Sequence, residues 1–161
     1  MATATSSLIG ANLTRTDTTA MFPLGTLINL SDGGQAMYVK ASTSALSTYA
    51  AVSIGAGGIA TMLTTTVAAS APGPIGFAQT SIATSNYGWV QLGGRPLINL
   101  ATNCDDLVPL FTTSTAGVLD DATVTAGFIF GVYGTTTISN ATAVTCVAIP
   151  AAFVGLYGGQ H

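Results

Sequence analysis

The chain has 161 residues, enough for one ordinary domain, and 6% of them are charged, against about 25% in an average soluble protein. Three basic residues are too few to neutralise a phosphate backbone or to form a polybasic membrane patch, and a hydrophobic fraction of 48% excludes a disordered chain. No window of about 20 residues is apolar enough for a spanning helix, so we expect binding to neither nucleic acid nor membrane.

Residues 1–20 are small and polar apart from Leu8 and Ile9, and they predict an extended N-terminal arm. The arm has too little apolar content to fold onto its own core. Either a partner surface holds it, through Leu8, Ile9 and Arg15, or it is a disordered tail; both interpretations stay open. Residues 21–161 are expected to form a β-rich domain.

The domain begins with a predicted hairpin. Residues 24–30 and 35–41 flank the turn Ser31-Asp32-Gly33-Gly34, in which aspartate initiates the turn and glycine tolerates a positive φ. The first strand places Ile28 and Leu30 on one face.

Residues 45–67 predict short strands around a flexible turn at Gly55-Ala56-Gly57-Gly58, with a helical turn near 45–51 as the alternative. Later strands are expected at 75–82, 87–92, 95–100, 107–112, 126–133 and 143–149. No amphipathic helix of three or more turns appears. Short strands about ten residues apart indicate an all-β fold, a single β-barrel or β-sandwich.

Several predicted strands are apolar on both faces, which a small domain does not need. In residues 128–133, Phe128 and Phe130 alternate with Ile129 and Tyr133. An antiparallel sheet with one solvated face would alternate apolar with polar residues. We therefore expect other subunits to cover part of this surface.

Few residues are suited to chemistry. The acidic pairs Asp105-Asp106 and Asp120-Asp121 are either a site for a hard cation such as calcium or solvated turn residues, and the spacing favours turns. Adjacent strand side chains point to opposite faces, which weakens each pair as catalytic carboxylates.

The only histidine is the last residue, His161, so few side chains are suited to general acid–base catalysis. We expect no enzyme activity, no cofactor and no metal site. Cys104 and Cys146 are expected to be free thiols, with a disulfide between them as the alternative.

Residues 76–94, GFAQTSIATSNYGWVQLGG, resemble the head decoration (cement) proteins of tailed bacteriophages. The family pattern is a Gly-x-Ala-Gln strand, a polar turn, then Tyr-Gly-Trp-Val-Gln and a glycine. Residues 24–39, 109–121 and 127–137 fit the flanking segments, so the resemblance covers roughly residues 21–150, although the family pattern carries more charge. The resemblance implies a β-rich fold, trimers on the outside of an icosahedral capsid, and no catalytic residues.

We therefore expect a virion protein, made in the host cytoplasm, that binds the capsid exterior and bridges capsomers. Its expected partners are the major capsid protein and further copies of itself, as a homotrimer. The candidate contact residues are Leu8, Ile9, Arg15, Tyr87, Trp89 and Arg95. The alternative is a tail fibre or spike module that binds a host receptor or glycan by stacking sugar on Tyr87, Trp89 or Tyr133, and burial of these rings discriminates between the two.

Overall fold

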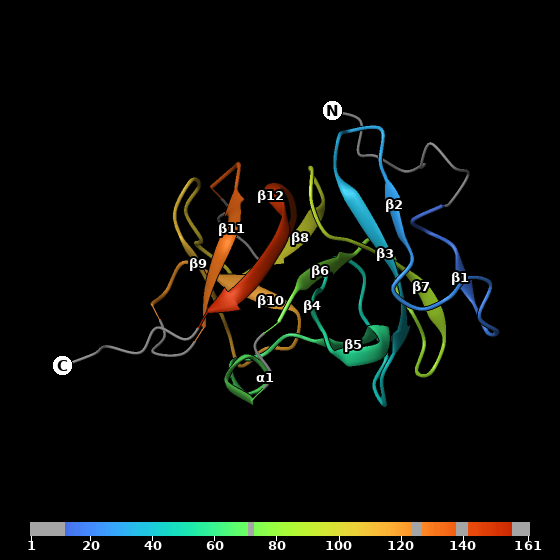
Figure 1. Cartoon of the computed structure of the whole chain (residues 1–161). Helices are drawn as coiled ribbons and strands as arrows, with labels where there is room; N and C mark the ends of the chain where they lie inside the picture. Colours follow the sequence, from blue (N-terminus) through green and yellow to red (C-terminus); the bar gives the residue numbers. More distant parts are fainter. Residues whose placement is uncertain (1–11, 71–72, 124–126, 138–141, 156–161) are drawn as a thin grey trace.

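The strands close into two small rings that lie side by side (Figure 1). The computed structural model describes residues 12–70, 73–123, 127–137 and 142–155, the last range by its backbone alone. This described part holds twelve β-strands, one short α-helix and one 3-10 turn, so the prediction of an all-β fold is confirmed. We call the two five-stranded rings barrel 1 and barrel 2.

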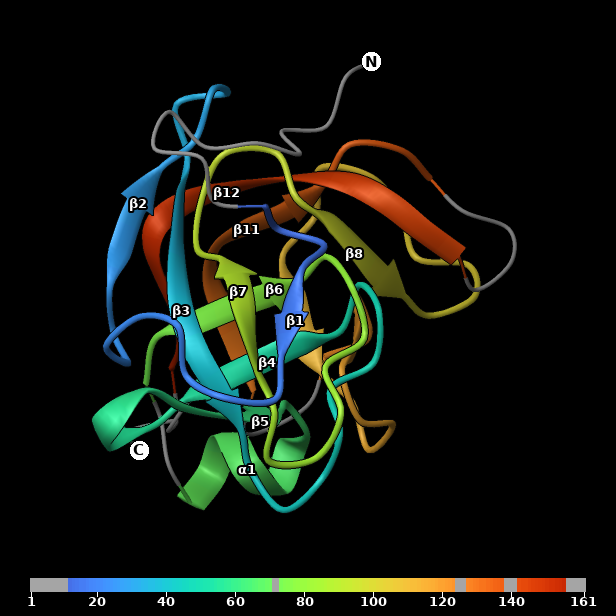
Figure 2. The same cartoon turned by 90° about the vertical axis from the view of Figure 1, so that its right-hand side faces the viewer.

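Barrel 1 is built from the first half of the chain. Its ring strands are β3 (Gln35–Ala41), β4 (Ala51–Ile54), β5 (Ile59–Met62), β6 (Ile75–Ala78) and β7 (Tyr87–Gln91). The sheet continues beyond the ring through β2 (Leu27–Asn29), which pairs with β3, and β1 (Thr16–Asp17), which pairs with β7. Figure 2 views the molecule from this side, with β1, β3 and β7 in front.

Barrel 2 follows at once in the chain. Its strands are β8 (Leu97–Leu100), β9 (Leu110–Thr112), β10 (Val118–Asp120), β11 (Phe128–Gly134) and β12 (Thr142–Gly155). The 3-10 turn η1 (Ala56–Gly58) joins β4 to β5, and the helix α1 (Thr65–Ser70) follows β5.

The two barrels share one pairing scheme. In each, the first strand in chain order pairs parallel with the third, and the third pairs antiparallel with the second. The second then pairs with the fourth, the fourth with the fifth, and the fifth closes the ring on the first, all antiparallel. The fold is therefore a tandem repeat of one five-stranded unit, although no repeat is evident in the sequence.

The register of the two units also corresponds. Ala60 in the third strand of barrel 1 pairs with Ala41 and Ile54. In barrel 2, Leu119 pairs with Leu100 and Thr112 in the same way. Each third strand follows directly after a glycine with a positive φ, 73° at Gly58 and 76° at Gly117, a backbone conformation that glycine adopts without strain.

Each barrel has its own apolar core, and the core of barrel 2 includes residues from barrel 1. Barrel 1 is filled by Val39, Ala41, Leu46, Val52, Ile54, Ala60, Ala78, Ile82, Val90 and Leu92. The core of barrel 2 extends outward to include side chains from the outer face of barrel 1. Ile75 and Phe77 of β6 pack there with Ile98, Leu110 and Ile129. The barrels therefore cannot be separated without exposing apolar surface.

Backbone hydrogen bonds also join the barrels. The Ala51 N–H donates to the Gly117 carbonyl at 3.0 Å, and the Gly117 N–H donates to the Leu63 carbonyl at 2.8 Å. Beside them, the Asn99 N–H donates to the Tyr49 carbonyl at 3.0 Å. Residues 21–155 thus contain no boundary between independent domains in the part of the chain that the structure describes.

The predicted hairpin is confirmed. β2 and β3 pair antiparallel across the turn at residues 31–34, and Ile28 and Leu30 lie on one face, in one buried cluster. The carboxylate of Asp32 accepts hydrogen bonds from the Gly34 N–H at 2.9 Å and, 63 residues further on, from the Arg95 N–H at 3.0 Å. One turn of barrel 1 is therefore hydrogen-bonded to the segment that leads into barrel 2.

A helix forms at α1, and the alternative of a helical turn near 45–51 is wrong. The Thr64 hydroxyl accepts the Val67 N–H at 3.1 Å, and the Thr64 carbonyl accepts the Ala68 N–H at 2.9 Å, which starts the helix. Ala68 is buried in the shared core. Among the described residues no helix is both long and apolar enough to cross a bilayer.

The expectation that the N-terminal segment cannot pack onto its own core is wrong for residues 12–17. Leu13 is only 1% exposed, and it packs with Ile28, Tyr38 and Trp89. Just after it, β1 pairs with β7. This segment joins the fold because one buried leucine and a short strand attach it to an aromatic cluster. Leu8 and Ile9 lie outside the described residues.

Candidate functional site

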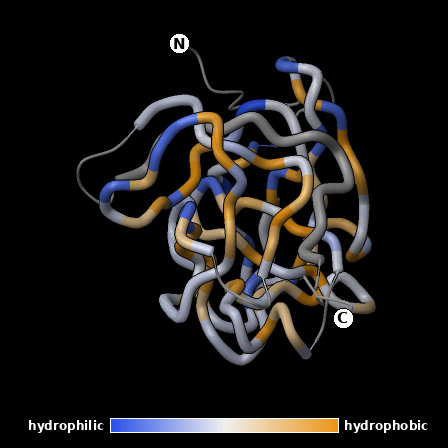
Figure 3. The backbone as a smooth tube through the Cα atoms, turned by 90° about the vertical axis from the view of Figure 1, so that its left-hand side faces the viewer, coloured by the Kyte–Doolittle hydropathy of each residue, from blue (hydrophilic) through white to orange (hydrophobic). Residues whose placement is uncertain are grey.

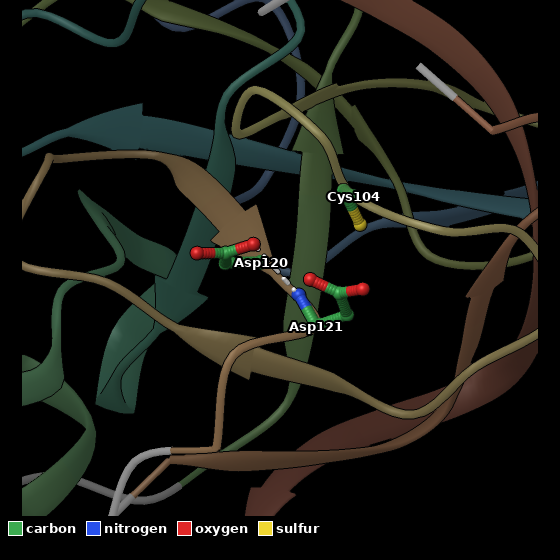
Figure 4. A group of neighbouring side chains, drawn as sticks. All are labelled: Cys104, Asp120 and Asp121. Carbon is green, nitrogen blue, oxygen red and sulfur yellow. Dashed lines mark hydrogen bonds between the residues drawn. The ribbon is translucent and has the colours of Figure 1, made fainter. Parts of the chain in front are cut away.

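The most concentrated group of potential ligand atoms lies at the end of β10. The Cys104 sulfur and one oxygen each of Asp120 and Asp121 all lie within 4.8 Å of one another (Figure 4). Cys104 is a free thiol and fully buried. The two aspartates come together because Asp121 lies beyond the last residue of β10, so the alternation expected of a strand does not apply to it.

The carboxylates of this cluster hold the backbone of the surrounding turns. The Asp121 carboxylate accepts the Asp105 N–H at 3.0 Å, which joins the two acidic pairs, and the Asp120 carboxylate accepts the Asp121 N–H at 2.9 Å. On the other side of the loop, the Thr137 hydroxyl donates to the Asp106 carboxylate at 3.0 Å. The prediction of solvated loop residues is confirmed for Asp105 and Asp106, which are exposed, but not for Asp120, which is half-buried and ends β10.

Burial and neighbouring charge make the thiol a weak acid. Burial, followed by the negative charge of Asp121, raises the pKa of Cys104 to about 11. Burial and a hydrogen bond with Asp121 also raise the pKa of Asp120 above its ordinary value. Both nucleophiles and metal ligands require the thiolate, so the protonated thiol is unreactive at neutral pH.

A metal at this cluster would need Cys104, Asp120 and Asp121 as ligands. This donor set mixes a soft sulfur with hard oxygens, whereas calcium takes oxygen ligands. The thiol would also have to lose a proton whose pKa is about 11. We therefore interpret the cluster as a structural clamp of the β10 end.

Three of the candidate contact residues lie together on the outer face of β3 and β7. Arg15 forms an ion pair with Asp17 at 2.9 Å, and the Tyr38 hydroxyl donates to the same carboxylate at 3.0 Å. The Tyr87 ring stacks on Tyr38 with the planes 11° apart. Arg15 is therefore a surface residue anchored beside an aromatic cluster.

Trp89 is not a surface residue. It is 2% exposed, and its ring lies 5.1 Å from Tyr38 and 5.3 Å from Phe22, centroid to centroid. Residues 12–22 of the same chain cover the Trp89 ring. The prediction that Trp89 contacts a partner directly does not fit this burial. Tyr87 is half-buried and carries the Lys40 ammonium 5.6 Å above its ring.

Arg95 lies apart from these residues. Its side chain is exposed, and its backbone N–H is held by Asp32 at the junction of the two barrels. The structure therefore brings Arg15, Tyr87 and Trp89 to one end of the molecule and Arg95 to the junction.

A second surface feature was not named from the sequence. A groove of about 400 Å³ on barrel 2 is lined by Pro109, Phe111, Thr123, Phe128 and Phe130; we call it the aromatic groove. Figure 3 looks onto this side of the molecule. Its signal in the sequence was the run of apolar residues on both faces of 128–133.

The aromatic groove adjoins a smaller hollow of about 250 Å³ that Leu107 and Tyr133 help to line. Leu107 is 69% exposed, the largest exposed fraction among the large apolar side chains of the described part. None of the described residues that line either hollow is charged. An uncharged, apolar concave surface is suited to binding another apolar surface.

Searches against models of known protein families and against curated proteins found no match to this chain.

Proposed function

We propose that this chain is a structural protein of a tailed-phage virion, which binds the outside of the capsid and bridges neighbouring capsomers. The observation that carries the proposal is the uncharged aromatic groove, because it is a surface for protein contact rather than for chemistry. The all-β fold and the clamp-like use of the aspartates agree with this role. The resemblance of residues 76–94 to decoration proteins points to the capsid as the site.

The physical basis of such a role is mass action. A protein that binds the assembled lattice but not its free subunits stabilises the lattice against disassembly. Many copies in a symmetric array multiply a modest contact through multivalency. The proposed partners are the major capsid protein and further copies of this chain in a homotrimer.

The charge of the chain supports the exterior of the capsid rather than its DNA-filled interior. The formal net charge is -3, and a protein facing packed DNA gains from being basic. The proposed role therefore involves no nucleic acid. It also involves no membrane, no cofactor and no enzyme activity.

Burial of the aromatic rings disfavours the alternative of a glycan-binding tail module. Trp89, the best stacking platform by residue type, is 2% exposed. The Tyr87 ring is stacked on Tyr38 of the same chain. Of the three rings considered, Tyr133 alone is accessible, with 38% exposure, and a single tyrosine is a poor platform.

Phage particles prepared with and without the protein test the proposal. We expect DNA release at a higher temperature from particles that carry it, and recovery of that temperature when purified protein is added back. A Phe130→Asp protein, altered in the aromatic groove, should restore the temperature less, and an Ile59→Asp protein, altered at an exposed strand position outside the groove, is its matched control. Equal release temperatures with and without the protein would contradict a stabilising role. If the protein co-purifies with phage tails rather than with heads, the tail module is favoured instead.

A further inference from the structure

The repeat makes it possible to compare one surface in two settings. The outward-facing residues of β4 and β6 in barrel 1 are Ala51, Ser53, Ile75 and Phe77. By the register of the strands, Ser53 faces Ile75 as Phe111 faces Phe128 in barrel 2. The same offset places Pro109 and Phe130 at the positions of Ala51 and Phe77. These four positions of barrel 2 are residues that line the aromatic groove.

In barrel 1 this face is covered by another barrel. Ile75 and Phe77 are 0% exposed, and they complete the core of barrel 2. Backbone hydrogen bonds at the edge of the face, such as Ala51 N–H to the Gly117 carbonyl, add to the contact. In barrel 1 this face of the five-stranded unit is therefore an interface with another unit of the same fold.

In barrel 2 no other barrel covers the corresponding face in the part of the chain that the structure describes. The Phe111 and Phe128 rings lie 5.6 Å apart and those of Phe128 and Phe130 4.4 Å apart, centroid to centroid, so the face is preformed. Phe130 is nevertheless 48% exposed. Phe111 is 9% exposed and Phe128 is half-buried, so Phe130 is the ring that opens most to water. An exposed phenylalanine beside two others, at a position that is buried in barrel 1, indicates a surface that another molecule covers.

We propose that another copy of this chain covers the aromatic groove. The equivalent face of barrel 1 is already covered by a barrel of the same fold. A barrel from a second copy of the chain could cover the groove in the same way. Figure 1 places β9 and β11, which carry the groove, at one end of the molecule and β1 and β2 at the other.

That far end offers an apolar counterpart, because Met21 and Phe22 are 57% and 43% exposed. The inference deepens the homotrimer of the proposed function by assigning the surface at which its copies meet.

The oligomeric state of the isolated protein tests this, without any capsid. By sedimentation velocity at high micromolar concentration we expect a multiple of the 16.0 kDa chain for the wild type and the mass of one chain for Phe130→Asp. Ile59→Asp, at an exposed apolar position of β5 away from both the groove and the Met21–Phe22 end, is expected to keep the wild-type mass. Circular dichroism and the thermal midpoint report whether each variant is folded.

If Phe130→Asp does not fold, Thr123→Asp decides, because it adds a charge at the exposed rim of the groove and removes no core packing. A monomeric wild type, or a groove variant that is folded and keeps the wild-type mass, would overturn the inference. Failure of an oligomeric wild type to bind capsids would contradict the proposed function and leave this inference standing.

Discussion

The side-chain amide of Gln79 pairs with the backbone of Leu97 as a neighbouring strand would. Its Oε1 accepts the Leu97 N–H at 3.1 Å, and its Nε2 donates to the Leu97 carbonyl at 3.1 Å. Gln79 follows β6 and Leu97 begins β8, so the pair joins barrel 1 to barrel 2 where no strand pairing is available. A glutamine is suited to this because its amide carries both a donor and an acceptor.

Replacing Gln79 by alanine should therefore destabilise the fold. Two backbone groups of Leu97 lose their partners, and an unsatisfied buried donor or acceptor costs about 1–3 kcal/mol. We expect a lower midpoint of urea unfolding for Gln79→Ala. Gln35→Ala removes a glutamine whose one side-chain hydrogen bond is exposed, and it should stay within about 0.5 kcal/mol of the wild type. Equal midpoints for the two variants would argue against the role of Gln79 at the junction.

The junction also depends on the absence of a side chain at Gly117. A Cβ atom there would lie 2.5 Å from the Ala50 Cβ, and the φ of 76° is strained for any other residue. Gly57 has a similar φ of 71° with open space around it. Gly57→Ala should cost about 1–2 kcal/mol from backbone strain, and Gly117→Ala about 1–3 kcal/mol more from overpacking. Denaturation of both variants measures the difference, and equal losses would mean that the close approach of the barrels is not needed.

The raised pKa of Cys104 predicts a loss of stability at alkaline pH. The thiol is protonated in the folded protein up to about pH 11, whereas its ordinary value is 9.0. Between these values the unfolded chain releases a proton that the folded chain retains, so the free energy of unfolding falls as pH rises. The slope contributed by one such group is at most about 1.4 kcal/mol per pH unit.

Comparing Cys104→Ala with the wild type isolates this contribution from that of other groups that titrate in the same range. The variant should be less stable at pH 7 because it leaves a small cavity, but its stability should fall less steeply between pH 9 and 11. Native protein should also react slowly with iodoacetamide at pH 8 and quickly after unfolding. A parallel pH dependence for the two proteins would contradict the assignment.

Leu13 makes residues 12–17 part of the fold. Leu13→Ala should cost about 2–5 kcal/mol, the usual range for a leucine in a packed core, while the exposed Thr18→Ala should have little effect. A deletion of residues 2–20 that melts at the wild-type temperature would show that Leu13 contributes nothing.

Local sequence patterns were sufficient to predict much of the fold. The hairpin of β2 and β3 follows from an Asp-Gly-Gly turn between two alternating segments, both of which are encoded within 15 residues. The absence of a long helix in the described part follows in the same way from the period of two. β10 was missed because its three residues, Val118–Asp120, are too few to show a period.

Some features of the candidate surfaces could be predicted from the sequence and others could not. The apolar character of both faces of 128–133 was visible in the sequence and predicted a covered surface. Trp89 was named as a candidate contact because its strand pattern does not show which face a preceding segment will cover. Its burial depends on Leu13 and Phe22, which lie more than 60 residues earlier in the chain.

The sequence by itself determined that this protein is an all-β chain with few groups suited to catalysis and with strands that are apolar on both faces. Composition and residue alternation carry that information locally. Only the tertiary structure decided that the strands close into two barrels of one design, that Asp120 and Asp121 meet Cys104, and that one barrel buries a face which the other leaves open. Those features depend on strand order and on contacts between distant segments, and no local pattern encodes them.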